Sequence, residues 1–257
     1  MLRTVTATRY VTPLREGGSL PGLVEADDDG LYVLKFRGAG QGPKALIADL
    51  VAGEIARVLG LPTPELVRIE LDPALGDAEP DFEIRRLLEQ SGGLNLGVDF
   101  LPGSLPFSPA VRPPPDPDFA ADVVWFDALV MNVDRTVRNP NLLTWHRRVW
   151  LIDHGAALYI HHTWHDPLQH ALGLFTPIRD QVLLPFAGSI EAADKRLAPL
   201  LDEARLTAIL AEVPDGWLAD DQRTPDERRN DYLDYLVKRL EHPRRFVEEA
   251  ERARSAA

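Results

Sequence analysis

The chain has 257 residues, of which 45% are hydrophobic and 26% charged, a balance typical of a globular protein with a sizeable core. It contains no cysteine, which excludes disulfides, thiolate nucleophiles and cysteine-bound zinc. Its formal net charge of −12 argues against duplex nucleic acid as the main partner. No apolar run reaches the roughly 18 residues of a membrane span, and no secretory leader is evident, so we expect a cytoplasmic protein without a membrane anchor.

The first hundred residues are rich in strand patterns. Alternating apolar residues and an Asp/Gly turn predict several strands, two of them joined in a hairpin. An apolar helix is expected to begin at Pro43, because proline is tolerated in a first turn, and to stop at Gly60. The predicted strand segments are residues 4–14, the hairpin 23–36, and residues 64–71 and 94–103.

The rest of the chain is predicted to be mainly helical. The proline-rich segment Ser108–Asp118 is the best linker candidate. A strongly apolar helix follows over residues 119–131, and an amphipathic helix capped by Thr224 begins at Pro225. Because strands dominate the first part and helices the second, the simplest arrangement is two unequal lobes joined near Leu101.

A lysine and a glutamate form the first candidate pair. Lys35 lies in the apolar strand "LYVLKF", and Glu54 falls on the apolar face of the next helix. A carboxylate on such a face is costly unless it is paired. Kinases pair a strand lysine with a helix acid in this way to hold the α- and β-phosphates of ATP. The alternative is that Glu54 reaches the rim and Lys35 belongs to an edge strand.

The segment "NVDRTVRNPNLLTWHRRVWLIDHG" carries the second candidate site. Asp134 and Asn139 have the D-x-x-x-x-N offset that protein kinases use between the catalytic aspartate and a metal-binding asparagine. Two short apolar runs around "HRR" predict a hairpin, which would bring Asp153 back near Asn139, where the two side chains could bind Mg²⁺. Gly155 gives the chain conformational freedom just after that aspartate.

The same segment resembles the catalytic loop and metal motif of the HipA-like kinases and, more distantly, of the type II phosphatidylinositol kinases. In those families the loop reads Asn-x-Asp-Arg, with an arginine directly after the catalytic aspartate. Asn132, Asp134 and Arg135 follow this order here. "LYVLKF" and "GLPTPE" resemble the N-lobe of that group, and "LNLGVDFLPG" resembles its hinge, where backbone groups would meet adenine. The resemblance implies an α+β, bilobal protein-kinase-like fold. Its small strand-rich N-lobe would span 1–101 and its larger helical C-lobe 102–257, together forming one catalytic domain.

The resemblance also implies dependence on ATP and Mg²⁺. Asp134 would act as the catalytic base or orient the acceptor, and Lys35 would hold the phosphates with Glu54 as its partner. Asn139 and Asp153 would bind the metal.

Several further residues are candidates for supporting roles. Asn141 is a possible supporting ligand or loop brace, and Asp127 a hydrogen-bonding brace of the catalytic loop. The segment "REGGSLPG" is not a G-x-G-x-x-G loop, although its backbone N–H groups could cover phosphates. Ser19 in that loop is either an autophosphorylation site, as the resemblance implies, or a turn serine. His161 and His165 have a helical zinc spacing, but substrate contact and ordinary packing are the alternatives.

These patterns favour a kinase that transfers the γ-phosphoryl group of ATP to a hydroxyl, with Ser/Thr of a protein as the preferred acceptor. A lipid headgroup is disfavoured, because anionic membranes attract basic surfaces and this chain is acidic. The alternatives are a nucleotide-binding pseudokinase or regulatory module, a small-molecule or lipid kinase, and an AMP transferase on the same fold. Expected partners are ATP and a protein substrate, with a regulatory protein as a further candidate and with neither nucleic acid nor membrane.

Overall fold

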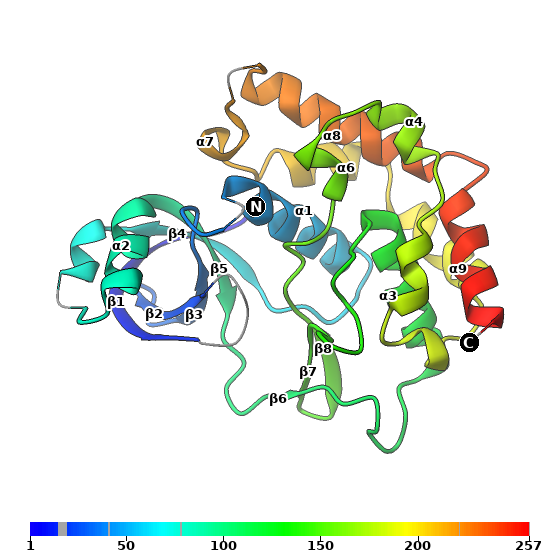
Figure 1. The fold of residues 1–257 in the computed structure, drawn as a ribbon, viewed down its shortest axis with the longest axis horizontal. Coiled ribbons are helices and arrows are strands. Elements are labelled where there is room, and N and C mark those ends of the chain that lie inside the picture. The colour runs from blue at the N-terminus through cyan, green and yellow to red at the C-terminus, as the bar shows by residue number, and fades with distance from the viewer. Residues whose placement is uncertain (15–19, 41, 78, 221, 257) are drawn as a thin grey trace.

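The computed structural model describes residues 1–14, 20–40, 42–77, 79–220 and 222–256, and it has an α+β fold. The first strands gather at one end of the molecule together with one helix, and most of the helices lie at the other end (Figure 1). Ser19, the candidate for autophosphorylation, lies outside the described residues together with most of its loop. Within the described parts, no helix combines the length and apolar character that crossing a membrane requires.

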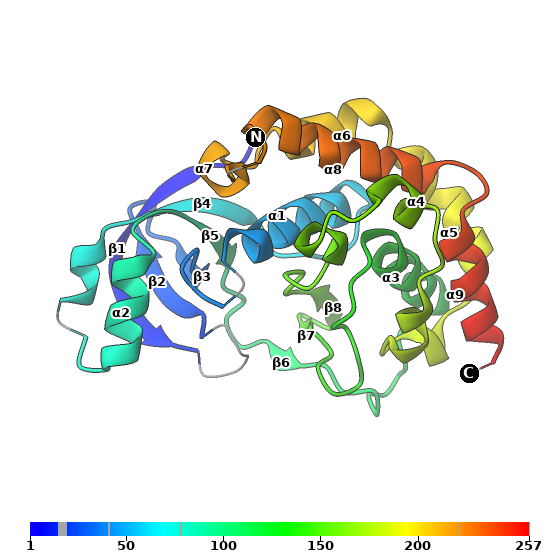
Figure 2. The same ribbon diagram turned by 45° about the horizontal axis from the view of Figure 1, so that its top comes forward.

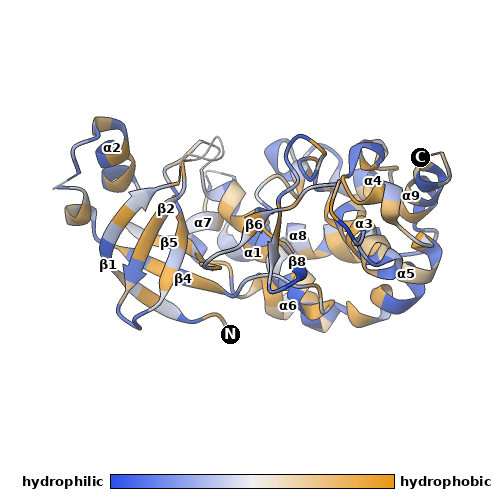
Figure 3. Ribbon diagram, turned by 90° about the horizontal axis from the view of Figure 1, so that it is seen from below, coloured by the Kyte–Doolittle hydropathy of each residue, from blue (hydrophilic) through white to orange (hydrophobic). Residues whose placement is uncertain are grey.

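Five strands close into a barrel in the order β1-β2-β3-β5-β4. All neighbours are antiparallel except β1 and β4. Gly97 makes room for the side chain of Ile69 on the neighbouring strand, because a Cβ there would lie 2.4 Å from Ile69 Cδ1. Figure 3 shows apolar residues along strands such as β5. The strands are β1 (Thr4–Pro13), β2 (Gly22–Ala26), β3 (Leu31–Lys35), β4 (Leu66–Leu71) and β5 (Gly93–Asp99).

A small second sheet, in the order β6-β7-β8, follows the barrel in sequence. It contains β6 (Leu105–Pro106), β7 (Leu142–Trp145) and β8 (Arg148–Leu151), and the last two form the predicted hairpin. His146 and Arg147 at its tip have φ of 48° and 62°, as in the tight turns that fit strand twist.

The three helices for which the sequence analysis gives a segment all form, and further helices lie between them. α3 begins at the Asp116 cap, whose carboxylate accepts two backbone N–H groups, and ends at Met131 in the left-handed region. α8 begins with the reciprocal Thr224–Glu227 capping box. The α-helices are α1 (Pro43–Val58), α2 (Phe82–Gln90), α3 (Pro117–Val130), α4 (Pro167–Ala171), α5 (Ile190–Leu197), α6 (Glu203–Leu210), α7 (Asp215–Leu218), α8 (Pro225–Leu240) and α9 (Arg245–Ser255). The 3₁₀ helices are η1 (Pro73–Gly76), η2 (Tyr159–His162), η3 (Thr176–Asp180), η4 (Leu184–Phe186) and η5 (Ala198–Leu200).

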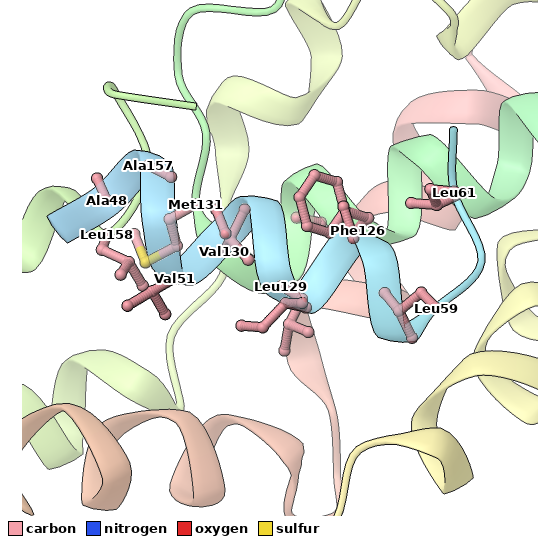
Figure 4. Close-up of a cluster of buried hydrophobic side chains, with 14 of the residues drawn as sticks. Ala48, Val51, Leu59, Leu61, Phe126, Leu129, Val130, Met131, Ala157 and Leu158 are labelled. Atoms are coloured by element: carbon pink, nitrogen blue, oxygen red, sulfur yellow. The ribbon is translucent and has the colours of Figure 1, made fainter. Parts of the chain in front are cut away.

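Helix α1 links the two ends of the molecule. It lies between the barrel and helices α6 to α8 (Figure 2). Its Ala48 and Val51 pack in the same core as Phe126, Val130 and Leu158 from the helical part (Figure 4). The barrel interior is a separate cluster. A helix within the first hundred residues therefore shares the core of the second part, and the division at residue 101 stays a prediction.

Candidate active site

Lys35 is the centre of a buried ion-pair cluster. Its Nζ lies 2.6 Å from Asp49 Oδ2 on α1 and 2.7 Å from Asp153 Oδ1, just after β8. Asp49 also accepts the backbone N–H of His154 at 2.5 Å. Three segments distant in sequence, β3, α1 and the stretch after the hairpin, are thus held together by one cation and its two carboxylates.

The three charges respond differently to this environment. Burial raises the pKa of Asp49 to about 6, although the charge of Lys35 opposes part of that effect. The charge of Lys35 lowers the pKa of Asp153 to about 2. Burial by itself would lower the pKa of Lys35, but the charges of Asp153 and Asp49 outweigh burial and raise it. The lysine is therefore a permanent cation, and Asp153, whose side chain is 46% exposed, remains open to a ligand.

The predicted pairing of Glu54 with Lys35 is wrong. Glu54 instead binds Arg57, one turn further along α1, with both carboxylate oxygens 3.0 Å from Nε. Asp49 and Glu54 are five residues apart and therefore point about 140° apart around the helix, so they cannot both face the same lysine. Glu54 is buried, as the sequence predicts, but its charge is balanced on the other side of α1.

Two asparagines hold the candidate catalytic aspartate. Asn139 Nδ2 donates to Asp134 Oδ2 at 2.7 Å, and Asn141 Nδ2 donates to the same oxygen at 3.2 Å. The backbone N–H of Asp134 donates to Asn132 Oδ1 at 3.1 Å. The carboxylate of Asp134 is half-buried. Both amides donate to Oδ2, which leaves Oδ1 available to accept a hydrogen bond from a substrate hydroxyl.

A buried ion pair lies beneath this loop. Asp127 on α3 accepts from Arg135 Nε at 2.9 Å, and it also binds Gln181 Nε2 at 2.9 Å and Asn132 Nδ2 at 3.2 Å. Arg135 and Asp127 side chains are both fully buried. The prediction that Asp127 braces the loop by hydrogen bonds is confirmed.

Arg135 connects the loop to the hairpin. Its guanidinium donates to the backbone oxygens of Asn141 and of Ile152, the latter at 3.2 Å, and to His154 Nδ1 at 3.0 Å. Burial lowers the pKa of His154 well below its ordinary value, and the charge of Arg135 acts in the same direction. The imidazole is therefore neutral and accepts through Nδ1.

The hairpin brings the aspartate after β8 back to the catalytic loop. The N–H of Ile152 donates to the oxygen of Asn141 at 3.1 Å, so Asn141 lies directly across from the segment that carries Asp153. Asp153 has a left-handed backbone with φ of 53°. Gly155 packs close behind, because a Cβ there would lie 3.1 Å from Asp49 Oδ2 and 3.5 Å from Asp153 Oδ1. Any larger residue at this position would crowd the ion-pair cluster.

The donor set is appropriate for a hard divalent cation that also binds phosphate. Asp153 provides a carboxylate, Asn139 and Asn141 provide amide oxygens, and such sites usually hold Mg²⁺ with few protein ligands. Among the described residues, no group of three or more His, Cys, Asp or Glu side chains is arranged to hold a metal. His161, considered for zinc, instead pairs its Nδ1 with the Tyr232 hydroxyl at 3.0 Å.

The sequence interpretation missed Asp49 and the role of Arg135. Asp49 lies on a helix that is buried around most of its circumference, so its apolar pattern does not distinguish one face from another. Two signals could have drawn attention to Asp49. It lies nearer the start of the helix than Glu54, and the helical angle between the two residues allows only one of them to face Lys35.

Comparison with known proteins identifies this arrangement. A family model described as HipA-like kinase matches residues 8–247, so the chain belongs to the HipA-like kinase family. It is a kinase, a phosphotransferase by class. The resemblance that the catalytic loop predicts is therefore confirmed. No curated protein matches the sequence significantly.

Two solved structures are similar to this chain at low sequence identity. The Helicobacter pylori proinflammatory kinase CtkA is similar with a TM-score of 0.61 and 13% identity, and the match covers 100% of this chain and 99% of that one. The Golgi casein kinase with Mn/ADP bound has a TM-score of 0.49 and 13% identity, and the match covers 95% of this chain and 75% of that one. The first likeness supports the kinase-like α+β fold.

Proposed function

We propose that the chain is an ATP- and Mg²⁺-dependent kinase that transfers the γ-phosphoryl group to a serine or threonine hydroxyl of a protein. The observation that carries the proposal is the contact of Lys35 with both Asp49 and Asp153. A lysine held between a helix acid and a metal-binding acid is what phosphate positioning by kinases requires. In this proposal residues 1–101 form the N-lobe and residues 102–257 the C-lobe, with α1 packed against both.

Each site residue has a distinct role. Lys35 holds the α- and β-phosphates, and Asp49 keeps its ammonium group in place. Asp134 accepts a hydrogen bond from the attacking hydroxyl through its unoccupied Oδ1 and takes its proton as the phosphoryl group is transferred. Asp153 and Asn139 hold the metal, with Asn141 as a brace or additional ligand. When bound, Mg²⁺ neutralises charge on the β- and γ-phosphates.

A protein hydroxyl is the preferred acceptor for two reasons. The net charge of −12 disfavours approach to an anionic lipid surface. Asp134 is half-buried and Asn139 beside it is exposed, so a segment of another protein can approach this loop. In this proposal the protein acts in the cytoplasm on a separate protein substrate.

The test is incubation with ATP labelled at the γ- or the α-phosphate, in parallel, with and without Mg²⁺ and in the presence of cell extract as acceptor. We expect γ-label, but not α-label, on protein serine or threonine, only when Mg²⁺ is present. Asp134→Asn should abolish this transfer and retain ATP binding. Transfer of α-label would show an AMP transferase instead, and tight ATP binding without any transfer would show a regulatory module.

A further inference from the structure

A groove lies on the side of the molecule where the hairpin tip meets the proline-rich segment before α3. Its cavity volume is about 780 Å³, which is within the range of binding sites for ligands. The loop after α1, residues 111–116 with the start of α3, and the tip of the β7–β8 hairpin form its walls. None of the catalytic residues lines it.

The groove is cationic although the protein is strongly acidic. Arg112 reaches it from one wall, and Arg147 and Arg148 from the hairpin on the other. Across the parts of the chain that the structure describes, none of the three forms a salt bridge. The one acid in the lining, Asp116, already accepts two backbone N–H groups as the cap of α3. Three cations therefore face a single carboxylate in a chain of net charge −12.

The floor of the groove is apolar, and the walls are rigid. Val111, Phe119 and Val149 contribute apolar side chains between the arginines. Trp145 Nε1 donates to Pro102 oxygen at 2.9 Å and its ring packs on Trp150 at 5.3 Å between centroids, which fixes the hairpin. Prolines 113–115 stiffen the opposite wall. An occupant with alternating acidic and apolar side chains matches this lining, and it would not have to order the groove on binding.

From this charge complementarity we propose that the groove docks an extended acidic segment of the protein substrate. This inference rests on the proposed phosphorylation of proteins. The four residues of β7 separate the tip from the catalytic loop by about 13 Å, at 3.3 Å per residue. The docking segment would therefore lie at least about four residues from the phosphorylated hydroxyl. Binding at the tip contacts the same hairpin whose base leads to Asp153, so docking and catalysis would share one rigid element.

The experiment measures fluorescence anisotropy of a labelled peptide of about eight glutamate and leucine residues with the intact protein. A lysine–leucine peptide and a short single-stranded oligonucleotide serve as comparison probes. Of the three probes, we expect only the acidic peptide to bind. Its binding should weaken as NaCl rises from about 50 to about 300 mM. Binding of the oligonucleotide in preference to the acidic peptide, or no binding of the peptide at low salt, would overturn the proposal.

Variants locate the binding. The double variant Arg147→Glu/Arg148→Glu should weaken peptide binding by roughly tenfold or more, because two attractive charges become repulsive. Its matched control, Arg86→Glu/Lys195→Glu, makes the same change in net charge at exposed positions outside the groove and should change binding by less than about twofold. Equal losses in both double variants would reduce the effect to overall charge and contradict the proposal.

Two further variants of the protein separate a folding defect and a loss of catalysis from a loss of docking. Arg112→Glu changes the opposite wall without touching the hairpin, and it should weaken binding by about threefold even if the double variant folds poorly. Asp134→Asn should bind the peptide as wild type does, because docking needs no turnover. Peptide binding that persists when no phosphoryl transfer is found would leave the groove standing and the proposed function refuted. Transfer without groove-dependent binding would refute only the groove.

Discussion

At the scale of single residues, the site depends on how two acids share one buried lysine. Lys35 contacts Asp49 inside the protein and Asp153 at its half-exposed edge. If one carboxylate is lost, Lys35 still has the other as a partner. One partner alone, however, does not fix both the position and the direction of the ammonium group. Phosphoryl transfer by kinases depends on how charges are positioned as well as on the charges themselves.

Asp49→Asn should therefore lower kcat/KM for ATP by about 100-fold, the usual effect of removing one preorganised electrostatic contact. Glu54→Gln is the matched control on the same helix and should change kcat/KM by less than about threefold, since Glu54 pairs with the exposed Arg57. Steady-state phosphoryl transfer measures both. A larger loss in Glu54→Gln than in Asp49→Asn would restore the pairing that the structure contradicts.

The raised pKa of Asp49 makes a separate prediction about stability. Its pKa is about 6 in the folded protein, above its ordinary 3.8, so the folded state binds more protons than the unfolded chain between these values. The contribution of Asp49 to the free energy of unfolding therefore decreases as pH rises through this window. Urea unfolding should show wild type losing stability relative to Asp49→Asn between about pH 4 and about pH 6. A difference that stays constant or grows with pH would contradict the assignment.

At the residue scale, the sequence predicts local chain geometry where spacing alone carries the information. The offset from Asp134 to Asn139 and the return of Asp153 through a hairpin follow from local chain geometry, and the structure brings Asn139 to Asp134. The partner of Lys35 depends on which face of α1 meets β3, and this is set by tertiary packing. Asn141 likewise comes to lie opposite Ile152, the residue before Asp153, only through the register of β7 and β8.

At the scale of elements, α3 and the hairpin carry the catalytic loop between them. α3 is almost entirely buried, and its Asp127 is one turn from the helix end, where the loop begins. Arg135 then ties the loop to the chain on both sides of the hairpin, at Asn141 and Ile152. The two elements are linked by a buried charge pair, which is costly to form but very sensitive to loss of one member.

Asp127→Asn should destabilise the protein by about 3 kcal/mol, because it leaves the guanidinium of Arg135 buried without an anion. Asp122→Asn is a matched control on the same helix. Asp122 pairs with the partly exposed Arg196, so that change should cost less than about 1 kcal/mol. Urea unfolding at neutral pH compares them. Equal costs would show that the buried pair has no special role in holding α3 to the loop.

A glycine substitution tests the approach of the hairpin to α1. Gly155→Ala places a methyl group 3.1 Å from Asp49 Oδ2, tighter than ordinary contact, so the ion-pair cluster must shift. We expect a loss of about tenfold in kcat, since small misplacements at a site are expensive. Gly216→Ala in α7 meets no atom within 4 Å and should leave kcat unchanged. Unchanged kcat in Gly155→Ala would mean that the cluster tolerates displacement.

At the scale of the whole molecule, α1 connects the barrel to the helical part. Its residues belong to the large core shared with α3, while Asp49 meets the lysine of the barrel strand β3. The sequence predicted the strands of the barrel, the β7–β8 hairpin and helices α1, α3 and α8, because their periodicity and caps are local. The sequence analysis assigned α1 to the strand-rich N-lobe, because the order of elements along the chain does not reveal which core a buried helix joins. The barrel closure through parallel β1 and β4 is likewise a long-range contact without a local signal.

The most direct test is a crystal structure of the intact chain with a non-hydrolysable ATP analogue and Mn²⁺, in which the anomalous signal locates the metal. We predict a metal peak between the phosphates and the side chains of Asp153 and Asn139, with Lys35 on the α- and β-phosphates and Asp134 facing the γ-phosphate. A metal peak remote from Asp153, or an analogue bound away from Lys35, would contradict the proposed active site.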